Sequence, residues 1–325
     1  MDQLQTTAGF HHPYTRQLHA IISTPDVHAN HLVLAAANAI MLHEPHLFEA
    51  VRQRAQQVNA INPAGTDDEH ILSYIFSVSR PFNLIHHRVT THGWPVSFNE
   101  FRALRPTRDA IRSINALHKQ FDPKSFNFNV VPREAFWRGT FRHRRVSLFY
   151  NKFPIERYHS LIVPDPEARQ EQFLEPADHA LAWDAQAVLS RHQPRLVIAY
   201  NAHGAGESVN HLHFQIVPST SDLPLMRKSV QEHYPIPVAE FSSPEAAWRH
   251  IHRLQSENRA FNAVYLPGRA LIIERAFQGH YQTPSWTNGF GWYELMGGIL
   301  TLDERAYRSL TDDQIAAVFA DITPR

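Results

Sequence analysis

The chain has no cysteine in its 325 residues. This absence excludes disulfide bonds, thiol nucleophiles and cysteine-ligated zinc, since each of them requires a sulfur atom. A long hydrophobic run is also missing: the longest, Leu32–Leu42, is interrupted by Asn38 and is much shorter than the roughly 20 residues that cross a bilayer. Met1–Tyr14 lacks the basic start and apolar core of a secretory signal. We therefore expect no membrane partner and a cytoplasmic location.

An excess of charge of either sign is absent too, because Lys plus Arg and Asp plus Glu both number 31. A neutral chain has no overall field that attracts nucleic acid, so we expect no nucleic-acid partner. The 23 histidines invite a metal site, but His11-His12 and His86-His87 are adjacent pairs without the i, i+4 spacing of helical metal ligands. We therefore expect no metal site and no cofactor. The hydrophobic content of 43% is enough for a substantial core.

The first 120 residues are predicted to be a mostly helical extension, and they carry no chemical motif. Thr24-Pro25-Asp26 has the composition of a helix start, and an Ala- and Leu-rich run follows it. Several prolines between residues 80 and 106 leave the structure of that segment open. The expected helices of this part cover residues 27–60, 67–77 and 107–118.

From about residue 125 onward the pattern changes to short strands separated by helices. Strands are predicted over residues 126–131, 146–151, 159–164, 195–200, 261–266 and 270–274, and the last two form a hairpin at Pro267-Gly268. Helices are predicted to begin near residues 176 and 244 and at the capping box Thr311-x-x-Gln314. These elements indicate two related units, over residues 121–220 and 221–325, of which the second is degenerate.

The most informative segment is Ser208–Pro218, in which His211, His213 and Gln215 occupy alternate positions. In a strand these three side chains share one face, while the apolar residues between them point to the core. An imidazole held there can attack phosphorus, with its other ring nitrogen oriented by a carbonyl, and a glutamine can hydrogen-bond without taking a proton. A chance occurrence of this spacing in a histidine-rich chain is the alternative. The Gly-containing turn at residues 201–206 favours a functional site.

These residues resemble the histidine-triad superfamily, in the branch that holds galactose-1-phosphate uridylyltransferases, dinucleoside tetraphosphate phosphorylases and GDP-hexose phosphorylases. In that branch His-x-His-x-Gln stands where the hydrolases have a third histidine. The likeness extends over about residues 125–325 and is strongest to the GDP-hexose phosphorylases, through Tyr200-Asn201, Gly204, residues 208–215, 151–154, 159–164 and 270–274, and Tyr293–Gly298. It implies an α+β fold, with a histidine-triad-like duplicated antiparallel sheet, flanking helices and a helical N-terminal extension.

The resemblance also implies a role for individual residues. His213 would be the nucleophile that takes the nucleotidyl group, His211 would orient or hydrogen-bond beside it, and Gln215 would hold a non-bridging oxygen. Glu294 matches a hexose-contacting position. The other substrate-binding positions implied are Ser208, Asn201, Asn151, Lys152, Gly204 and Asn210. The missing zinc cysteines, and Leu212 in place of a proline between the histidines, are departures that argue against galactose metabolism.

The function expected from this resemblance is nucleotidylyl transfer. A GDP-hexose type of nucleotide sugar or a dinucleoside polyphosphate would be split through a nucleotidyl-histidine, with phosphate or a sugar phosphate as acceptor. A hydrolase of the same fold and a non-catalytic nucleotide-binding protein are the alternatives. Local alternatives also stand: Asn151 as a strand end, Lys152 as a solvated charge, Trp292 and Tyr293 as core, and the arginine-rich residues 138–145 as an exposed basic face. The base, the sugar and the oligomeric state stay open.

Overall fold

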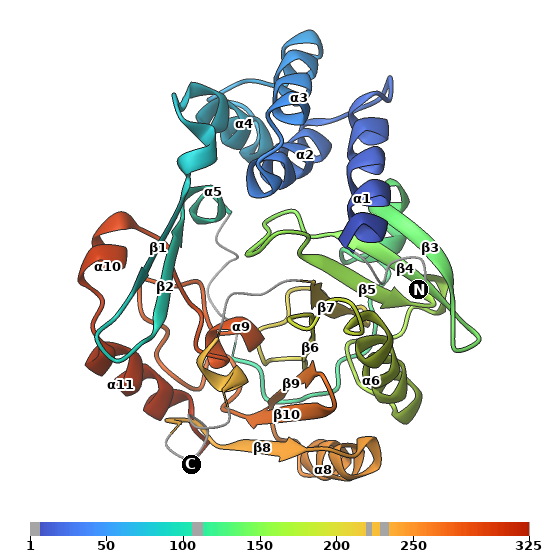
Figure 1. Ribbon diagram of the computed structural model, residues 1–325, viewed down its shortest axis with the longest axis vertical. Coiled ribbons are helices and arrows are strands. Elements are labelled where there is room, and N and C mark those ends of the chain that lie inside the picture. The colour runs from blue at the N-terminus through green and yellow to red at the C-terminus, as the bar shows by residue number, and fades with distance from the viewer. Residues whose placement is uncertain (1–6, 106–112, 219–222, 228–233, 325) are drawn as a thin grey trace.

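The computed structural model describes residues 7–105, 113–218, 223–227 and 234–324, and Figure 1 shows a helical N-terminal part above a large twisted sheet. The N-terminal helices are α1 (Thr7–Ile22), α2 (Ala29–Leu42), α3 (Pro45–Gln57) and α4 (Asp67–Ser77). Helix α4 confirms the expected helix over residues 67–77, and Thr66 and Glu69 form a capping box at its start. No helix among the described residues is long and apolar enough to cross a membrane.

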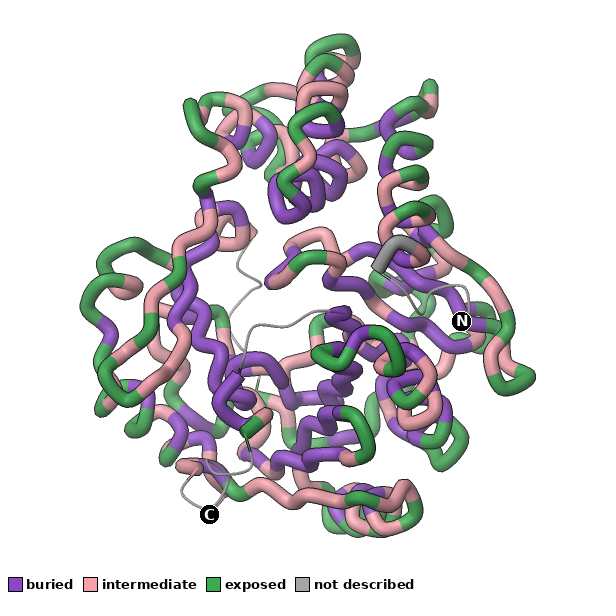
Figure 2. Tube along the Cα trace, viewed as in Figure 1, coloured by how far each residue is buried: buried purple, intermediate pink, exposed green. Residues whose placement is uncertain are grey.

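The single helix predicted over residues 27–60 is wrong. Helix α2 ends at His43, which adopts a left-handed conformation with φ of 57°, and Pro45 then begins α3. Thr24–Val27 forms a turn and not a helix start, because Val27 N donates to the carbonyl of Thr24. All residues from Leu32 to Leu42 are buried, so α2 is the central helix of this part (Figure 2).

The large sheet has eight strands in the order β3-β4-β5-β7-β6-β9-β10-β8, and every neighbouring pair is antiparallel. The strands are β3 (Ala135–Phe141), β4 (Arg144–Tyr150), β5 (Ser160–Pro164), β6 (Val197–Asn201), β7 (Phe214–Val217), β8 (Val238–Phe241), β9 (Phe261–Leu266) and β10 (Arg269–Glu274). The strands predicted near 146–151, 159–164, 195–200, 261–266 and 270–274 are confirmed. So is the β9–β10 hairpin, in which Gly268 supplies a φ of 71° that other residues rarely adopt.

The remaining strand and helix predictions have mixed outcomes. The strand predicted over residues 126–131 is wrong, because Phe128–Val130 forms a 3₁₀ turn that the Asn127 side chain caps. The strand of that region is β3, which pairs with β4 across a turn where Arg142 and His143 have positive φ. Of the helix predicted over residues 107–118, residues 107–112 lie outside the described part and residues 113–118 are not helical.

Helices cover both faces of the large sheet. Helices α6 (Pro176–Leu189) and α8 (Pro244–Ser256), both predicted, pack on one face in the same apolar core as α1 and α2. The other face carries α9 (Trp292–Leu295) and α11 (Asp312–Ile322) with a second core, while α10 (Glu304–Ser309) packs against a smaller, separate sheet. The capping box predicted for α11 is present, and Ile315 and Phe319 are buried as expected.

A second sheet links the N-terminal part to the end of the chain. Its strands lie in the order β1 (Ile85–Val89), β2 (Pro95–Asn99) and β11 (Ile299–Thr301). The short helix α5 (Glu100–Ala103) directly follows β2 in the chain. Strands β2 and β11 are parallel, with Val96 beside Ile299. Residues 85–99, which belong to the segment whose structure the sequence left open, therefore form a hairpin, and this hairpin pairs with a strand about 200 residues later in the chain. The domain boundary near residue 120 and the division at 220 stay predictions.

Candidate active site

The motif Ser208–Pro218 is a strand only over its second half, since β7 begins at Phe214. Residues 211–213 have a different partner, the loop before α6. Leu212 N donates to the carbonyl of Gln170 at 2.8 Å, and the side-chain amide of Gln172 bonds both the N–H of His213 (2.9 Å) and its carbonyl (3.1 Å). The predicted alternation survives: Leu212, Phe214 and Ile216 are fully buried in the core shared with α6.

The ring of His213 is fixed as one tautomer. Its Nδ1 lies 2.8 Å from the carbonyl oxygen of His211, and because a carbonyl can only accept, Nδ1 carries the hydrogen and Nε2 the lone pair. No hydrogen bond joins Nε2 to another of the described residues. Burial lowers the pKa of His213, so the ring is neutral at pH 7. A neutral imidazole with a free lone pair is a nucleophile.

The ring of His211 is fixed as the opposite tautomer. The backbone N–H of Phe128 donates to Nδ1 at 3.1 Å, which leaves the hydrogen on Nε2. Within the described part of the chain this buried Nε2 has no partner at full hydrogen-bond geometry, although the Pro166 backbone interacts with the ring and opposes the lowering of its pKa. Burial and the neighbouring His213 lower the pKa of His211 to about 4. The two rings lie 5.4 and 5.5 Å, between centroids, from the ring of Phe128.

The amide of Gln215 is oriented by two donors. Its Oε1 accepts a hydrogen bond from Trp292 Nε1 at 2.8 Å and from His159 Nε2 at 3.0 Å. The backbone N–H of Ile155 donates to His159 Nδ1, so the hydrogen of that ring lies on Nε2. Burial lowers the pKa of His159 to about 3, and the ring therefore stays neutral. Sequence reasoning assigned no role to His159.

Asn201 and Glu294 lie around the start of α9, close to Gln215. Asn201 Oδ1 accepts from Asn262 Nδ2 at 2.7 Å and from the backbone N of Trp292 at 3.0 Å. Glu294 Oε2 accepts from Gly291 N at 2.9 Å, and burial raises the pKa of the Glu294 carboxyl. The structure thus brings three predicted site residues, Asn201, Gln215 and Glu294, to one helix terminus.

Two further predicted residues follow β4. Asn151 Nδ2 lies 3.3 Å from His159 Nε2, which places Asn151 beside the Gln215 group. Lys152 Nζ forms an ion pair with Asp68 on α4 at 2.6 Å, so the structure joins Lys152 to the N-terminal helices and not to the motif.

The loop before the motif holds the remaining predicted residues. Gly204 has a φ of 75°, and its N–H donates to the carboxylate of Glu207, which shapes the turn. Asn210 Oδ1 accepts from the backbone N of Gln172 at 3.1 Å, so Asn210 holds the adjoining loop. Ser208 is exposed on the same loop.

Sequence reasoning missed residues whose contacts are non-local. Gln172 is buried, bonds His213 and also donates to the carbonyl of Asn201 at 2.9 Å, yet its segment has no periodic pattern. Asn262 gave no signal either, since it lies inside a predicted strand. For Trp292 both alternatives hold in part, because it is a core residue that also bonds Gln215.

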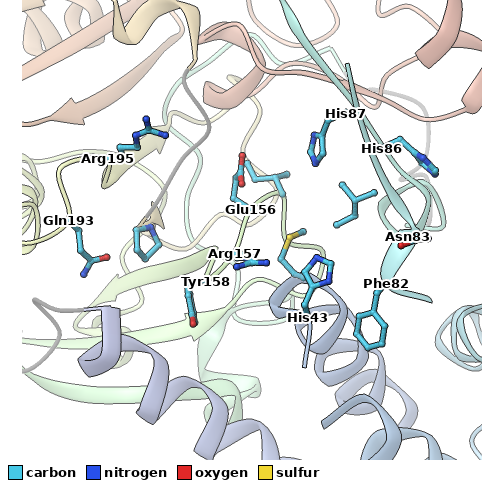
Figure 3. Close-up of a pocket in the computed structure, with 14 residues that line it drawn as sticks. His43, Phe82, Asn83, His86, His87, Glu156, Arg157, Tyr158, Gln193 and Arg195 are labelled. Carbon is cyan, nitrogen blue, oxygen red and sulfur yellow. The ribbon is translucent and has the colours of Figure 1, made fainter. Parts of the chain in front are cut away.

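Two pockets differ in their relation to the motif. One of about 470 Å³ adjoins Phe128, the residue that contacts both motif histidines, and is also lined by Asn129, Ser147, Phe149, Arg138 and Glu167. A larger one of about 970 Å³ is lined by residues such as His43, His86, Arg157 and Arg195 (Figure 3). None of the predicted site residues lines the larger pocket. The smaller pocket is lined by none of them either. It adjoins the motif histidines through Phe128, whereas the larger one reaches only the last residue of the motif, Pro218.

Most of the arginines in the hairpin over residues 138–145 form ion pairs with aspartate or glutamate side chains elsewhere in the chain. Arg144 bonds Asp165 at 2.7 Å and Asp178 at 2.6 Å, and Arg142 pairs with Asp184 at 3.0 Å. These pairs agree with an exposed basic face, while Arg138 lines the smaller pocket. Within the described residues no group of three or more His, Asp or Glu side chains is arranged to hold a metal ion.

The fold and the motif together define a protein with a histidine-triad-like fold. Its structure is similar to the crystal structure of yeast Ap4A phosphorylase Apa2, with a TM-score of 0.52, 15% sequence identity, and coverage of 78% of this chain and 93% of that one. The structure of the same enzyme in complex with Ap4A gives a TM-score of 0.52 at 16% identity, over 74% and 88% of the two chains. The predicted fold class is confirmed.

The sequence has more particular relatives. Residues 90–217 match the family model described as GDPGP1-like, N-terminal domain. GDP-D-glucose phosphorylase 1 of Bos taurus is 33% identical over 132 residues, which are 38% of this chain and 33% of that protein. The Macaca fascicularis protein of the same name is 29% identical over 191 residues, or 56% and 46% of the two chains. The matches span less than half the length of these relatives, and the resemblance to this branch of the histidine-triad superfamily is confirmed.

Proposed function

We propose that the chain is a phosphorylase that transfers a nucleotidyl group from a GDP-hexose, or from a dinucleoside polyphosphate, to phosphate or a sugar phosphate through His213. The observation that carries the proposal is the tautomer of His213, because the bond from Nδ1 to the His211 carbonyl leaves a free lone pair on Nε2. The names of the relatives, and the presence of the motif within the matched residues 90–217, support it.

The reaction proceeds in two displacements. In the first, Nε2 of His213 bonds to the α-phosphorus, and the bond from that phosphorus to the bridging oxygen breaks, releasing a hexose phosphate from a nucleotide sugar. In the second, an oxygen of inorganic phosphate attacks the same phosphorus and Nε2 leaves, giving the nucleoside diphosphate. Two displacements at moderate barriers replace one difficult step.

Neighbouring groups assist these steps as donors. The amide NH₂ of Gln215 and the Nε2–H of His211 would hold non-bridging oxygens, which carry most of the charge in the transition state. Asn151, Asn201 and Ser208 remain proposed substrate contacts, and Glu294 remains the proposed hexose contact. The pocket of about 470 Å³ beside Phe128 would take the nucleoside. The proposal includes a cytoplasmic location and small-molecule partners alone.

The experiment is product analysis by mass spectrometry. The protein is incubated with GDP-glucose, or with diadenosine tetraphosphate, with and without inorganic phosphate. We expect GDP and glucose 1-phosphate from GDP-glucose, formed only when phosphate is present. Release of GMP without phosphate would indicate the hydrolase, and binding without any turnover would indicate a non-catalytic protein.

A further inference from the structure

Two donors reach the same atom of Gln215 from separate elements of the fold. Trp292 lies at the start of α9, and His159 immediately precedes β5. Both bond Gln215 Oε1, at 2.8 and 3.0 Å. An indole N–H can only donate, so the atom that Trp292 bonds must be the amide oxygen. The orientation of the amide is therefore set by the chemistry of its neighbours.

The His159 ring cannot change its role in this arrangement. Its Nδ1 accepts from the backbone N–H of Ile155 at 3.2 Å, and a backbone N–H also can only donate. The hydrogen is therefore on Nε2, facing Gln215. His159 is 1% exposed and Trp292 is 1% exposed, so water has little access to either bond.

We propose that His159 and Trp292 are positioning residues that lock the Gln215 amide with its NH₂ toward the reacting phosphorus. This inference rests on the proposed function. A glutamine amide without these partners can turn over by 180°, and its oxygen would then face the negatively charged phosphate oxygens and repel them. Both bonds are to the amide oxygen, and among the described residues the NH₂ of Gln215 has no partner, so it is free to donate to substrate.

The central variant is Trp292→Phe, which removes one N–H and keeps most of the aromatic packing. We expect kcat to fall about tenfold with KM unchanged, which is the effect of one hydrogen bond in a buried site. In a Gln215→Ala background the same substitution should cause no further loss, because the amide that it orients is gone. Trp286→Phe is the matched control; Trp286 packs against Phe290, is not bonded to Gln215, and its replacement should leave kcat unchanged.

A pair of variants at His159 separates donation from packing. His159→Gln keeps an N–H donor and should retain most of kcat, whereas His159→Leu removes the donor and should lower kcat as Trp292→Phe does. Equal losses in the two variants, or a loss from Trp292→Phe that persists in the Gln215→Ala background, would overturn the inference, because both would show that these residues act through the fold alone.

The same single and double variants can also be compared by their free energies of unfolding in urea, a measurement that needs no substrate. The substitutions Trp292→Phe and Gln215→Ala should be coupled, in that together they destabilise less than the sum of their separate effects. If wild-type protein cleaves neither GDP-glucose nor diadenosine tetraphosphate but the coupling is present, the proposed function fails and the locked amide stands. If the coupling is absent, the inference fails whatever the activity.

Discussion

The side chain of Gln172 takes the place of a neighbouring strand beside His213. Its Oε1 accepts from His213 N at 2.9 Å and its Nε2 donates to His213 O at 3.1 Å, as the backbone of a paired strand would. The same Nε2 bonds the carbonyl of Asn201. One buried amide thus fixes the backbone of the proposed nucleophile and of a second site residue, at the point where β7 has not yet begun.

Replacing Gln172 with Leu should destabilise the protein strongly. The substitution leaves one N–H and two carbonyls without partners in a buried site, and we expect the free energy of unfolding to fall by about 2–4 kcal/mol. Urea unfolding measures this. Gln186→Leu is the control: among the described residues the buried side chain of Gln186 makes one long bond, of 3.5 Å to Leu196 O, so its loss should cost much less. Equal losses in the two variants would contradict this account of Gln172.

The unfolding free energy should decrease with falling pH below about 6.5. Burial lowers the pKa of His159 to about 3 and that of His211 to about 4, while an unfolded histidine titrates near pH 6.5. Between these values the unfolded state binds more protons, so the stability that these neutral rings contribute is present above pH 6.5 and is lost as the pH falls. Urea unfolding across pH 4–7 checks this dependence.

A variant assigns that pH dependence to a residue. His159→Gln removes a titrating group and should reduce the slope of unfolding free energy against pH, near pH 5, by about one proton. An unchanged slope in His159→Gln would mean that its ring is not the buried neutral group described above.

Glu294→Ala should weaken the use of GDP-glucose without preventing nucleotidylation of His213. Glu294 lies two residues after Trp292, the partner of Gln215, at a position proposed to contact the hexose. Loss of one or two hydrogen bonds to a sugar hydroxyl should lower kcat/KM about tenfold to a hundredfold. Steady-state kinetics and intact-protein mass spectrometry check both parts. Abolition of the covalent step, as complete as that caused by loss of His213, would show that the assignment is wrong.

The N-terminal helices should be needed for a stable protein. Phe10 on α1 is fully buried, with its ring 5.4 Å from that of Phe136 on β3, so Phe10→Ala should cost about 3–5 kcal/mol of unfolding free energy. Phe126→Ala, at a side chain that is 52% exposed, should have a small effect. Limited proteolysis that rapidly removes residues 1–120 and leaves an active, stable remainder would argue against this docking.

Local signals explain what the sequence could predict. Helices α4 and α11 begin at capping boxes, and the β9–β10 hairpin turns at Pro267-Gly268, so the patterns within each segment were sufficient. The spacing of His211, His213 and Gln215 likewise identified the motif strand's faces. The likeness to known enzymes, and not the spacing, gave these residues their expected roles.

Non-local contacts explain what the sequence could not predict. Strand β2 pairs with its neighbour β1 and also with β11, about 200 residues later, and no pattern near Val96 records the second partner. The bonds from Gln172 to His213 and from His159 and Trp292 to Gln215 are of the same kind. A loop glutamine, a residue just before a strand or the first residue of a short helix carries no periodic signal, and only the fold shows which backbone or side chain it meets.

The most direct test of the account is the site of the covalent nucleotide. Wild-type protein is incubated with GDP-glucose in the absence of phosphate, digested under basic conditions, and sequenced by mass spectrometry, because a phosphoramidate is stable to base and labile to acid. The account predicts a guanosine monophosphate adduct on His213 that phosphate discharges, and a loss of turnover by several orders of magnitude in His213→Ala. An adduct on His211, or full activity in His213→Ala, would contradict it.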